Sequence, residues 1–588
     1  MGNLKHTLSI VLGTAAIAMA ANPLTTKFYS ADAAALVHND SLFIFAGHDE
    51  QGPQGNNNKW FFMNDWHVLV TDDMENYHDY GAVLSWRTFK WASGNAFAGH
   101  CEYRNGKFYW YVAVHHATVV RDEGFAIGVA VADHPSGPWK DAIGKALITD
   151  DTPNDVALNI DPAIFYDGND IWMYWGSWGA GRRVKLKSNM VELAGKPEDI
   201  KIRDFFEAPW MHKYRGNYYF TYASGYPSTI NYSMAKSING PWTQKGVLND
   251  KMENSETNHQ AVFKYLGHWY FMYHGATAPG GWTYCRSVNI DYLYYDKDAN
   301  IQKIVRTKNG VDKVNNALVE NGSYRLTVSH SNLSLVDEKG VVVQRAFNEK
   351  DRNHFWTVKR SGKNARHYTV QNVGTGLYYC PPKTLLDTVK TSASACEIRI
   401  ENASAKKGYY LYGDYDSDFV GDVLNVSTDP GMPVITWVRT GTDNQKVQLQ
   451  KAEAPERVSS SSVAVLSSSS AVVSSSSEAL SSSSEAFSSS SEAFSSSSEE
   501  ALNSEVGTSS SSETTGLQNR VAVEQSMRYD AAMQTVFFSE NTRWAVFDVN
   551  GVALYRGFGR EIRMNSLRSG VYLVKSGAKN MRILHRAR

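Results

Sequence analysis

The chain has 588 residues, which is long enough for three or four ordinary domains. Its apolar fraction of 42% and charged fraction of 20% are typical of globular proteins. The 59 Lys and Arg almost balance the 60 Asp and Glu, so the net charge of -1 creates no field that would attract nucleic acid or an anionic membrane. We therefore expect no nucleic-acid partner.

Residues 1–20 have the three parts of a signal peptide. A basic start at Lys5 and His6 is followed by an apolar run from Leu8 to Met19, which ends among small residues. The run is too short to span a bilayer comfortably. We therefore expect the mature chain to be secreted or attached to the outer cell surface.

The four cysteines of an exported chain could form two disulfides. Cys380 and Cys396 are close in sequence, whereas Cys101 and Cys285 lie far apart. We expect a disulfide between Cys380 and Cys396 only. Cys101 and Cys285 are expected to be buried thiols, because neither has the spacing of a zinc site.

Residues 21–310 contain a repeated strand pattern. Five segments place a polar or acidic residue before an apolar strand, a turn and an aromatic-rich strand: ADAAALVHNDSLFIFAG, AGHCEYRNGKFYWYVAV, IDPAIFYDGNDIWMYWGS, FEAPWMHKYRGNYYFTYAS and NHQAVFKYLGHWYFMYHG. Helical periodicity is nearly absent. Five such meanders predict a five-bladed β-propeller, because radial repetition leaves each sheet only short exposed edges.

The residues that open these repeats are the candidates for chemistry, since a propeller places the first strand of every blade around a central channel. They include Asp32, Asp161, Glu207 and His259. One such carboxylate alone could be an ordinary turn residue, but three in equivalent positions indicate a shared site. Paired carboxylates facing one pocket suit glycosidic cleavage, in which one donates a proton to the leaving oxygen and the other activates water.

The motifs around these residues resemble those of glycoside hydrolase family 43. The resemblance covers about residues 24–305 and rests on SADAAALVHND, NIDPAIFYDG and FFEAPWMHKYRGNYYFTYAS, supported by WASGNAFAGHCEYRNGKFYWYVAV and RSVNIDYLYYDKDANIQKI. It implies inversion, with Asp32 as general base, Glu207 as general acid and Asp161 as the residue that raises the acid's pKa and orients it. The family commonly has proline after the base, where this chain has Ala33; the change could loosen Asp32 but keeps its carboxylate.

The same resemblance suggests binding residues. Arg286 is similar to the family's substrate-contacting arginine, and His259 to a central histidine near a calcium or other ion, reached through water. A satisfied core histidine is an equal alternative for His259. The resemblance implies no cofactor for the chemistry, with a structural calcium in the propeller channel as a further expectation. Trp91, Phe97 and Trp178 are candidate walls of the sugar pocket, each equally able to serve in packing.

Residues 320–451 contain three weakly similar, strand-rich units, which resemble a ricin-B-type β-trefoil. The Gln-x-Trp corners of that family would fall on residues 354–356 and 445–447, and both are degraded here. The resemblance implies carbohydrate binding, with simple packing against the propeller as the alternative.

The remaining sequence divides into a linker and a basic tail. Residues 457–515 are mostly Ser in units such as SSSSEAF, which predict a disordered linker because they offer no coiled-coil seam. Residues 519–588 carry 12 Lys and Arg against 5 Asp and Glu and alternate apolar with polar residues around Asn-Gly and Ser-Gly turns. They predict a small β-sandwich that resembles type IX C-terminal sorting domains, whose partner is export or cell-surface machinery; adhesion to acidic polysaccharide is the alternative.

Together these patterns predict an all-β chain with a five-bladed β-propeller, a β-trefoil, a disordered linker and a C-terminal β-sandwich. The predicted function is that of a monomeric inverting glycosidase that removes α-L-arabinofuranosyl groups from arabinoxylan or related plant cell-wall hemicellulose. One alternative is a β-xylosidase acting on xylo-oligosaccharides. Another is a catalytically inactive surface protein that binds carbohydrate, which Ala33 and the accessory domains would suit.

Overall fold

The computed structural model of the chain describes residues 22–315, 317–361, 366–404, 407–413, 419–457, 527–530, 534–547, 553–564, 567, 570–576 and 579–585. The predicted signal peptide and residues 458–515 of the predicted linker lie outside the described residues. The chain divides into two compact units, Met1–Pro455 and Glu456–Arg588.

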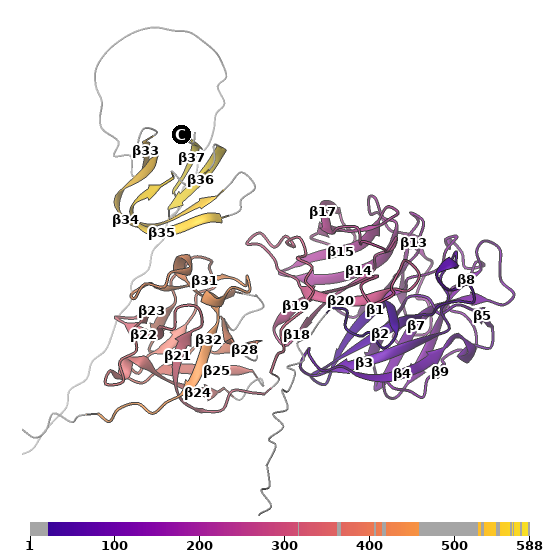
Figure 1. The fold of residues 1–588 in the computed structure, drawn as a ribbon, viewed down its shortest axis with the longest axis horizontal. Coiled ribbons are helices and arrows are strands. Elements are labelled where there is room, and N and C mark those ends of the chain that lie inside the picture. Colours follow the sequence, from indigo (N-terminus) through magenta and orange to yellow (C-terminus); the bar gives the residue numbers. More distant parts are fainter. Residues whose placement is uncertain are drawn as a thin grey trace, which may run out of the picture. The chain divides into compact units, whose positions relative to one another are not determined.

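The described residues form strands joined by loops, as expected for an all-β chain (Figure 1). Helical structure in them is confined to five short 3-10 turns: η1 (Gly55–Asn57), η2 (Trp86–Thr88), η3 (Arg352–His354), η4 (Leu424–Val426) and η5 (Asp443–Gln445). None of the helical segments among these residues has the length and apolar character needed to cross a bilayer.

Five separate antiparallel sheets follow one another between residues 29 and 292. Their strands are β1 (Tyr29–His38), β2 (Ser41–Asp49), β3 (Asp65–Thr71) and β4 (His78–Ser85); β5 (Ala92–Gly94), β6 (Gly99–Arg104), β7 (Lys107–His116), β8 (Phe125–Ala132) and β9 (Lys140–Asp141); β10 (Ala163–Asp167), β11 (Asp170–Trp175), β12 (Arg182–Leu186) and β13 (Glu198–Asp199); β14 (Glu207–Tyr214), β15 (Asn217–Ser224), β16 (Thr229–Ala235) and β17 (Thr243–Asn249); and β18 (Gln260–Tyr265), β19 (His268–Gly275) and β20 (Ser287–Tyr292). Each repeat segment found in the sequence covers one hairpin of one sheet.

The five sheets surround a common centre. Strand β1 contacts β6, β6 contacts β10, β10 contacts β14, β14 contacts β18, and β18 contacts β1 again. The second strand of each hairpin is largely buried, because it lies between neighbouring strands and between neighbouring sheets; in β19 all eight residues are buried. Residues that open β1, β10, β14 and β18 therefore meet near the centre of the ring.

Residues 136–139 (SGPW) and 239–242 (NGPW), which directly precede the edge strands β9 and β17, form matching turns in two of these sheets. Gly137 has a φ of 83° and Gly240 a φ of 82°, a left-handed conformation that glycine adopts at little cost. A Cβ at either glycine would lie within 3 Å of the backbone nitrogen of the tryptophan two residues later, Trp139 or Trp242. The two turns thus require glycine both for conformation and for space.

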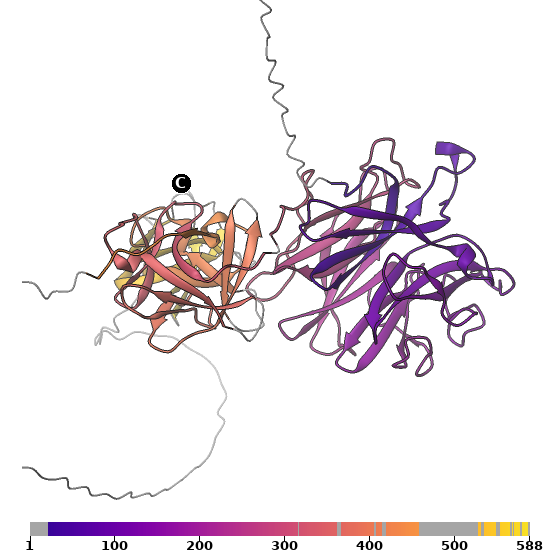
Figure 2. The ribbon, with the colours of Figure 1, turned by 90° about the horizontal axis from the view of Figure 1, so that it is seen from below.

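Residues 322–451 form a second strand-rich body within the same unit, shown in orange tones in Figure 2. One continuous network of twelve strands builds it: β21 (Gly322–Val328), β22 (Ser334–Glu338), β23 (Val341–Arg345), β24 (Phe355–Arg360), β25 (His367–Asn372), β26 (Tyr378–Cys380), β27 (Lys390–Ser392), β28 (Ile398–Ser404), β29 (Gly408–Gly413), β30 (Phe419–Val423), β31 (Val434–Val438) and β32 (Val447–Lys451). Its core is centred on Trp356, Tyr368 and Tyr379, which are all fully buried.

This second body contacts the five sheets through buried polar groups. Arg439 Nη1 donates to Nδ1 of His268 at 2.9 Å, and Nε2 of His268 donates to the carbonyl of Asn402 at 2.7 Å. Burial and the charge of Arg439 lower the pKa of His268 to about 3, so the ring is neutral and can both accept and donate. The hydroxyl of Tyr412 donates to the carbonyl of Gly267 at 3.2 Å. Buried polar groups that are paired in this way fix one arrangement of the two bodies.

The second unit contains an antiparallel sheet of β33 (Met527–Asp530), β34 (Thr535–Phe547), β35 (Ala553–Arg563), β36 (Gly570–Ser576) and β37 (Lys579–His585). Strand β34 pairs with β33, β35 and β36, and its register with β35 shifts between Phe537 and Thr542. Val536, Val546 and Val574 lie at the centre of its apolar core. The sandwich expected for residues 519–588 stays a prediction.

The predicted cysteine chemistry is confirmed. Cys380 and Cys396 form a disulfide, and Cys101 and Cys285 are buried free thiols. The bridge closes a sequence separation of 16 residues that carries β27, so it restricts the unfolded chain in the second body only.

Replacing both Cys380 and Cys396 by Ser is expected to lower the free energy of unfolding of the second body by about 3 kcal/mol, because a loop of this length gains entropy when opened. Scanning calorimetry of the full chain measures the change. Reductant should shift the wild type in the same direction and leave the variant unchanged. A variant that unfolds at the wild-type temperature would contradict the assignment of this bridge as a stabilising element.

Candidate active site

A cavity of about 440 Å³ opens where the five sheets meet. Its polar lining contains the predicted residues Asp32, Asp161, Glu207, His259 and Arg286. Its apolar lining comes mainly from loops, with Trp60, Phe61, Met63, Phe97, Ala98, Leu158, Ile160, Trp178, Phe206 and Tyr226. A few charged groups are thus gathered in an otherwise apolar cavity, the usual character of a small-molecule site.

Regular strand geometry is interrupted at or next to each acidic residue. The pairing of β1 with β2 shifts register between Ala31 and Ala34, and Asp32 in that bulge has a φ of 49°. The pairing of β14 with β15 shifts after Glu207, where Ala208 has a φ of 56°. Asp161, two residues before β10, has a φ of 58°. Bulges of this kind re-aim side chains, and left-handed non-glycine residues are concentrated at functional sites.

Asp32 is held as an anion. Nη1 of Arg286 donates to its Oδ1 at 3.0 Å, and Nδ1 of His259 lies 3.5 Å from the same oxygen. The backbone N–H of Asp32 also donates to Nδ1 of His274 at 3.2 Å. Burial alone would raise the pKa of Asp32, but the charge of Arg286 and the hydrogen bond with His259 hold it well below its usual value.

Glu207 is held as a neutral acid at mildly acidic pH. Burial, and then the negative charge of Asp161, raise the pKa of Glu207 to about 7. The hydroxyl of Ser177 donates to Oε2 of Glu207 at 2.7 Å, which fixes the orientation of the carboxyl group. Of the three carboxyl groups in the cavity, Glu207 therefore holds its proton to the highest pH.

The pKa of Asp161 lies between those of Asp32 and Glu207. Its Oδ2 accepts the backbone N–H of Ala208 at 3.0 Å, so it is tied to the residue directly after Glu207. Burial raises the pKa of Asp161 to about 6, opposed by the positive charge of His259 4.0 Å away. Because Asp161 and Glu207 repel each other when both are charged, a proton lost from one favours retention of the proton on the other.

Arg286 is the most fully engaged group of the site. Its Nε and Nη2 donate to the two oxygens of Asp49 at 2.8 and 2.9 Å, and its backbone N–H donates to the same carboxylate at 2.8 Å. Arg286 and Asp49 are 3% and 1% exposed. The ring of Phe61 lies 4.2 Å from the guanidinium carbon and covers it. Arg286 borders the cavity as predicted, but most of its donors bind protein carboxylates.

The predicted wall residues divide into two groups. Phe97 and Trp178 line the cavity. Trp91 does not: its Nε1 donates to Asp141 at 2.9 Å and its ring stacks on His116, so the prediction for Trp91 is wrong. Trp91 directly precedes β5, which pairs with β7 of the second sheet, and its indole is held there by Asp141 of the outer strand β9 and by His116 at the end of β7.

Sequence reasoning missed Asp49, Ser177, His274 and the aromatic residues of the β2–β3 loop. These residues lie outside the equivalent positions that opened the repeats. An acidic residue at the end of a buried strand requires a partner, so the sequence does indicate that Asp49 is paired. The sequence does not indicate which partner, because Arg286 lies 237 residues away.

The described residues around His259 do not form a calcium cage. Calcium takes six to eight oxygen ligands, whereas His259 offers nitrogen and the nearby carboxylates already bind Arg286 and the N–H of Ala208. A calcium ion held through water therefore stays a prediction.

Known proteins match the part of the chain that forms the five sheets. Residues 20–301 match the model of Glycosyl hydrolases family 43. A xylosidase/arabinosidase of Bacteroides ovatus is 31% identical over 318 residues, covering 46% of this chain and 94% of the relative. An arabinoxylan arabinofuranohydrolase of Bacillus subtilis is 28% identical over 353 residues, covering 50% of this chain and 66% of the relative. A solved GH43_1 enzyme of Xanthomonas citri, complexed with xylose, has 29% identity and a TM-score of 0.43, covering 49% of this chain and 93% of its own.

A cavity that keeps one carboxyl group ionised and another protonated at the same pH is equipped for acid–base hydrolysis, and with these relatives the chain is a glycosidase. It belongs to glycosyl hydrolase family 43.

The clamp between Asp49 and Arg286 can be tested by Asp49→Ala. Removing one partner leaves a buried cation with a single carboxylate, which is expected to lower the free energy of unfolding by about 3–5 kcal/mol. Urea unfolding of the full chain measures the loss. The exposed Glu253→Ala serves as a control that should change stability by less than about 0.5 kcal/mol. Equal effects of both substitutions would contradict a buried clamp.

Proposed function

We propose that the chain is an inverting glycosidase that removes α-L-arabinofuranosyl groups from arabinoxylan or related plant hemicellulose. The observation that carries the proposal is the opposite protonation of Asp32 and Glu207 in one cavity. Inversion requires this pairing, because a single displacement by water needs a base and an acid at the same moment.

The proposed step uses three groups. Asp32 takes a proton from water as the water oxygen bonds to the anomeric carbon, and the bond from that carbon to the leaving oxygen breaks. Glu207 gives its proton to the leaving oxygen. Asp161 raises the pKa of Glu207 by its charge and positions the residue after it through the N–H of Ala208. The cycle ends with proton exchange with solvent, so no cofactor enters the balance.

Ala33 does not argue for loss of activity. A proline at this position would fix the backbone beside Asp32, and here other contacts do so: Arg286 binds the carboxylate and His274 accepts the backbone N–H. The carboxylate that a base requires is present and ionised. This supports an enzyme over a protein that only binds carbohydrate.

The aromatic mouth of the cavity supports a sugar substrate. Trp60, Trp178 and Tyr226 are 48%, 53% and 53% exposed although each lines the cavity. Large exposed rings beside a polar floor suit the apolar face of a sugar, whose hydroxyl groups then reach the carboxyl groups below.

The names of the relatives point to two classes of substrate, arabinofuranosyl side groups and xylosides. Names of the relatives include arabinoxylan arabinofuranohydrolase, xylosidase/arabinosidase and beta-xylosidase. The HDEQG phrase after the first hairpin and the GHCEYRNGKFYWYVAV segment resemble the arabinoxylan-active members of the family most, and this resemblance supports arabinofuranosyl removal. A β-xylosidase acting on xylo-oligosaccharides is the second candidate.

The rest of the chain adds proposals of its own. The closed ring of contacts among β1, β6, β10, β14 and β18 supports a five-bladed β-propeller over residues 21–310. We interpret residues 320–451 as a β-trefoil that binds carbohydrate, and residues 519–588 as an attachment or sorting domain of a secreted or surface-bound monomer. A carbohydrate-binding module beside the catalytic part would hold the enzyme on an insoluble polymer.

Glu207→Gln tests the acid and the substrate together. The variant keeps the shape of the side chain but cannot donate a proton, so hydrolysis of arabinoxylan is expected to fall by about 10²–10⁴-fold. Proton NMR of the wild-type reaction should show arabinose appearing first as the β-anomer. Glu253→Gln, an exposed acid, is the matched control and should retain activity. Xylose as the product would favour the β-xylosidase. If neither the wild type nor the variants released a sugar, carbohydrate binding without hydrolysis would be the better account.

The pH profile tests the two protonation states. Activity requires Glu207 protonated and Asp32 ionised, so kcat/KM should fall about tenfold per pH unit above about pH 7 and stay high down to below the usual pKa range of aspartate. Ser177→Ala removes a hydrogen bond that favours ionised Glu207, so the alkaline limb should move to higher pH. An unchanged alkaline limb in this variant would contradict the assignment of that limb to Glu207.

A further inference from the structure

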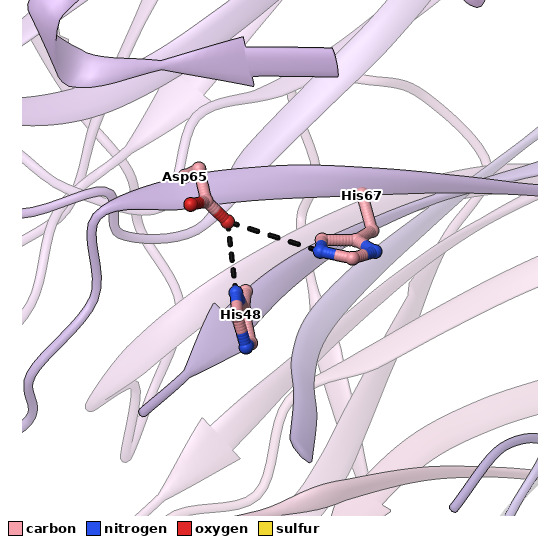
Figure 3. A group of neighbouring side chains, drawn as sticks. All are labelled: His48, Asp65 and His67. Carbon is pink, nitrogen blue, oxygen red and sulfur yellow. Dashed lines mark hydrogen bonds and ion pairs between the residues drawn. The ribbon is translucent and has the colours of Figure 1, made fainter. Parts of the chain in front are cut away.

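A second group of polar side chains lies apart from the catalytic carboxyl groups, at the base of the loop between β2 and β3. His48 is near the end of β2, and Asp65 and His67 are near the start of β3. Residues 65 and 67 are two apart and share a face of the sheet, and the pairing of β2 with β3 ends at Gly47 and Trp66, so residues 48 and 65 follow directly at its end. Figure 3 shows the carboxylate of Asp65 between the two imidazole rings.

The three side chains have the spacing of metal ligands. Oδ1 of Asp65 lies 2.8 Å from Nδ1 of His48 and 3.9 Å from Nε2 of His67 (Figure 3). One ligand atom from each residue falls within 4.8 Å of the other two. Tetrahedral ligands at zinc are roughly 3.4 Å apart, so small side-chain rotations would place all three around one ion. Oε1 of Glu50, 3.9 Å from Nδ1 of His48, is a further carboxylate within reach.

The surroundings hold the rings in a ligating orientation. Nδ1 of His67 donates to Oδ1 of Asp79 at 3.2 Å, which leaves the lone pair of Nε2 directed toward Asp65. A carboxylate on the other ring nitrogen is the usual support of a metal-bound histidine. The ring of Phe28 stacks on His67 at 4.0 Å and meets His48 edge-on at 5.5 Å, so it shields both imidazoles.

We propose that His48, Asp65 and His67 bind one divalent transition-metal ion of the zinc class. Two imidazoles and one carboxylate suit zinc and are poor ligands for calcium, which prefers an all-oxygen shell. The ion replaces the proton that His48 shares with Asp65. A water molecule or Glu50 completes the shell.

The acidic cluster of Asp122, Asp150 and Asp155 differs from the proposed metal site in its ligand types and in its hydrogen bonding. Arg121 already pairs with Asp122 and Asp155. One oxygen of Asp150 accepts three backbone N–H groups, and the other accepts Asn159. That cluster is satisfied by protein donors and offers only carboxylates.

The proposed ion is a clamp on a loop of the catalytic cavity. Residues 50–64 join its ligands, and Trp60, Phe61 and Met63 of this loop line the cavity. Asp49, next to His48, holds Arg286. A bound ion closes this loop at its base, as a crosslink does, and reduces the number of conformations open to it. Such a clamp would act on the loop whichever sugar the enzyme releases.

Metal retention tests the site. The full chain is stripped with chelator, dialysed against equimolar Zn²⁺ and Ca²⁺, and analysed by mass spectrometry of the elements. We expect one zinc per chain in the wild type, and its loss in Asp65→Asn and His67→Ala. His134→Ala removes an exposed histidine of another sheet and should retain the zinc. Equal zinc in the wild type and His67→Ala would overturn the site, as would a wild type that retains none.

Two further measurements separate ligation from folding. Co²⁺ in place of zinc should give visible d–d absorption in the wild type and in His134→Ala, and none in His67→Ala whose circular dichroism is native. Asp79→Asn keeps all three ligands and is expected to weaken zinc binding roughly 10–100-fold. Wild-type affinity in Asp79→Asn would overturn the role of Asp79. Zinc should also slow proteolysis within residues 50–64, and an unchanged cleavage rate would overturn the clamp.

Discussion

The catalytic cavity depends on one buried cation. Arg286 lies between the last sheet of the ring and the first, where its carbonyl accepts the backbone N–H of Ser30 and its guanidinium binds Asp32 and Asp49. The closure of the ring and the ionisation of Asp32 therefore rest on the same residue. A buried guanidinium is costly unless its donors are paired, and the two carboxylates of the first sheet supply that pairing.

The same cation explains how one cavity keeps its acids in different states. Burial raises the pKa of every carboxyl group in it, and at Asp32 the charge of Arg286, aided by hydrogen bonds with the neighbouring histidines, reverses the effect. Arg286 contacts Asp32 directly, whereas Glu207 has the hydroxyl of Ser177 and the negative charge of Asp161 as neighbours. The difference between base and acid thus comes from which side of the cavity the guanidinium occupies.

Sequence patterns predicted the hairpins and the acidic residues at their starts, because strand alternation and repeat positions are local properties. They did not predict Asp49, whose partner Arg286 is distant in sequence, or the bulge that turns Asp32 into the cavity. They also suggest Trp91 as a wall of the cavity, but contacts with Asp141 and His116, 50 and 25 residues further along the chain, hold its indole elsewhere. Contacts between sheets have no period that a single sequence can show.

The end of β2 contributes one residue to the cluster of His48, Asp65 and His67 and the next residue to the contacts of Arg286 in the catalytic cavity. Successive residues of a strand point to opposite faces, so His48 meets Asp65 and His67 while Asp49 meets Arg286. A shift of this strand end toward either side would move both sets of contacts. The protonation of Asp32 then depends on the conformation of a loop base as well as on the cavity itself. The base of this loop therefore has to keep its conformation if Asp49 is to hold Arg286 against Asp32.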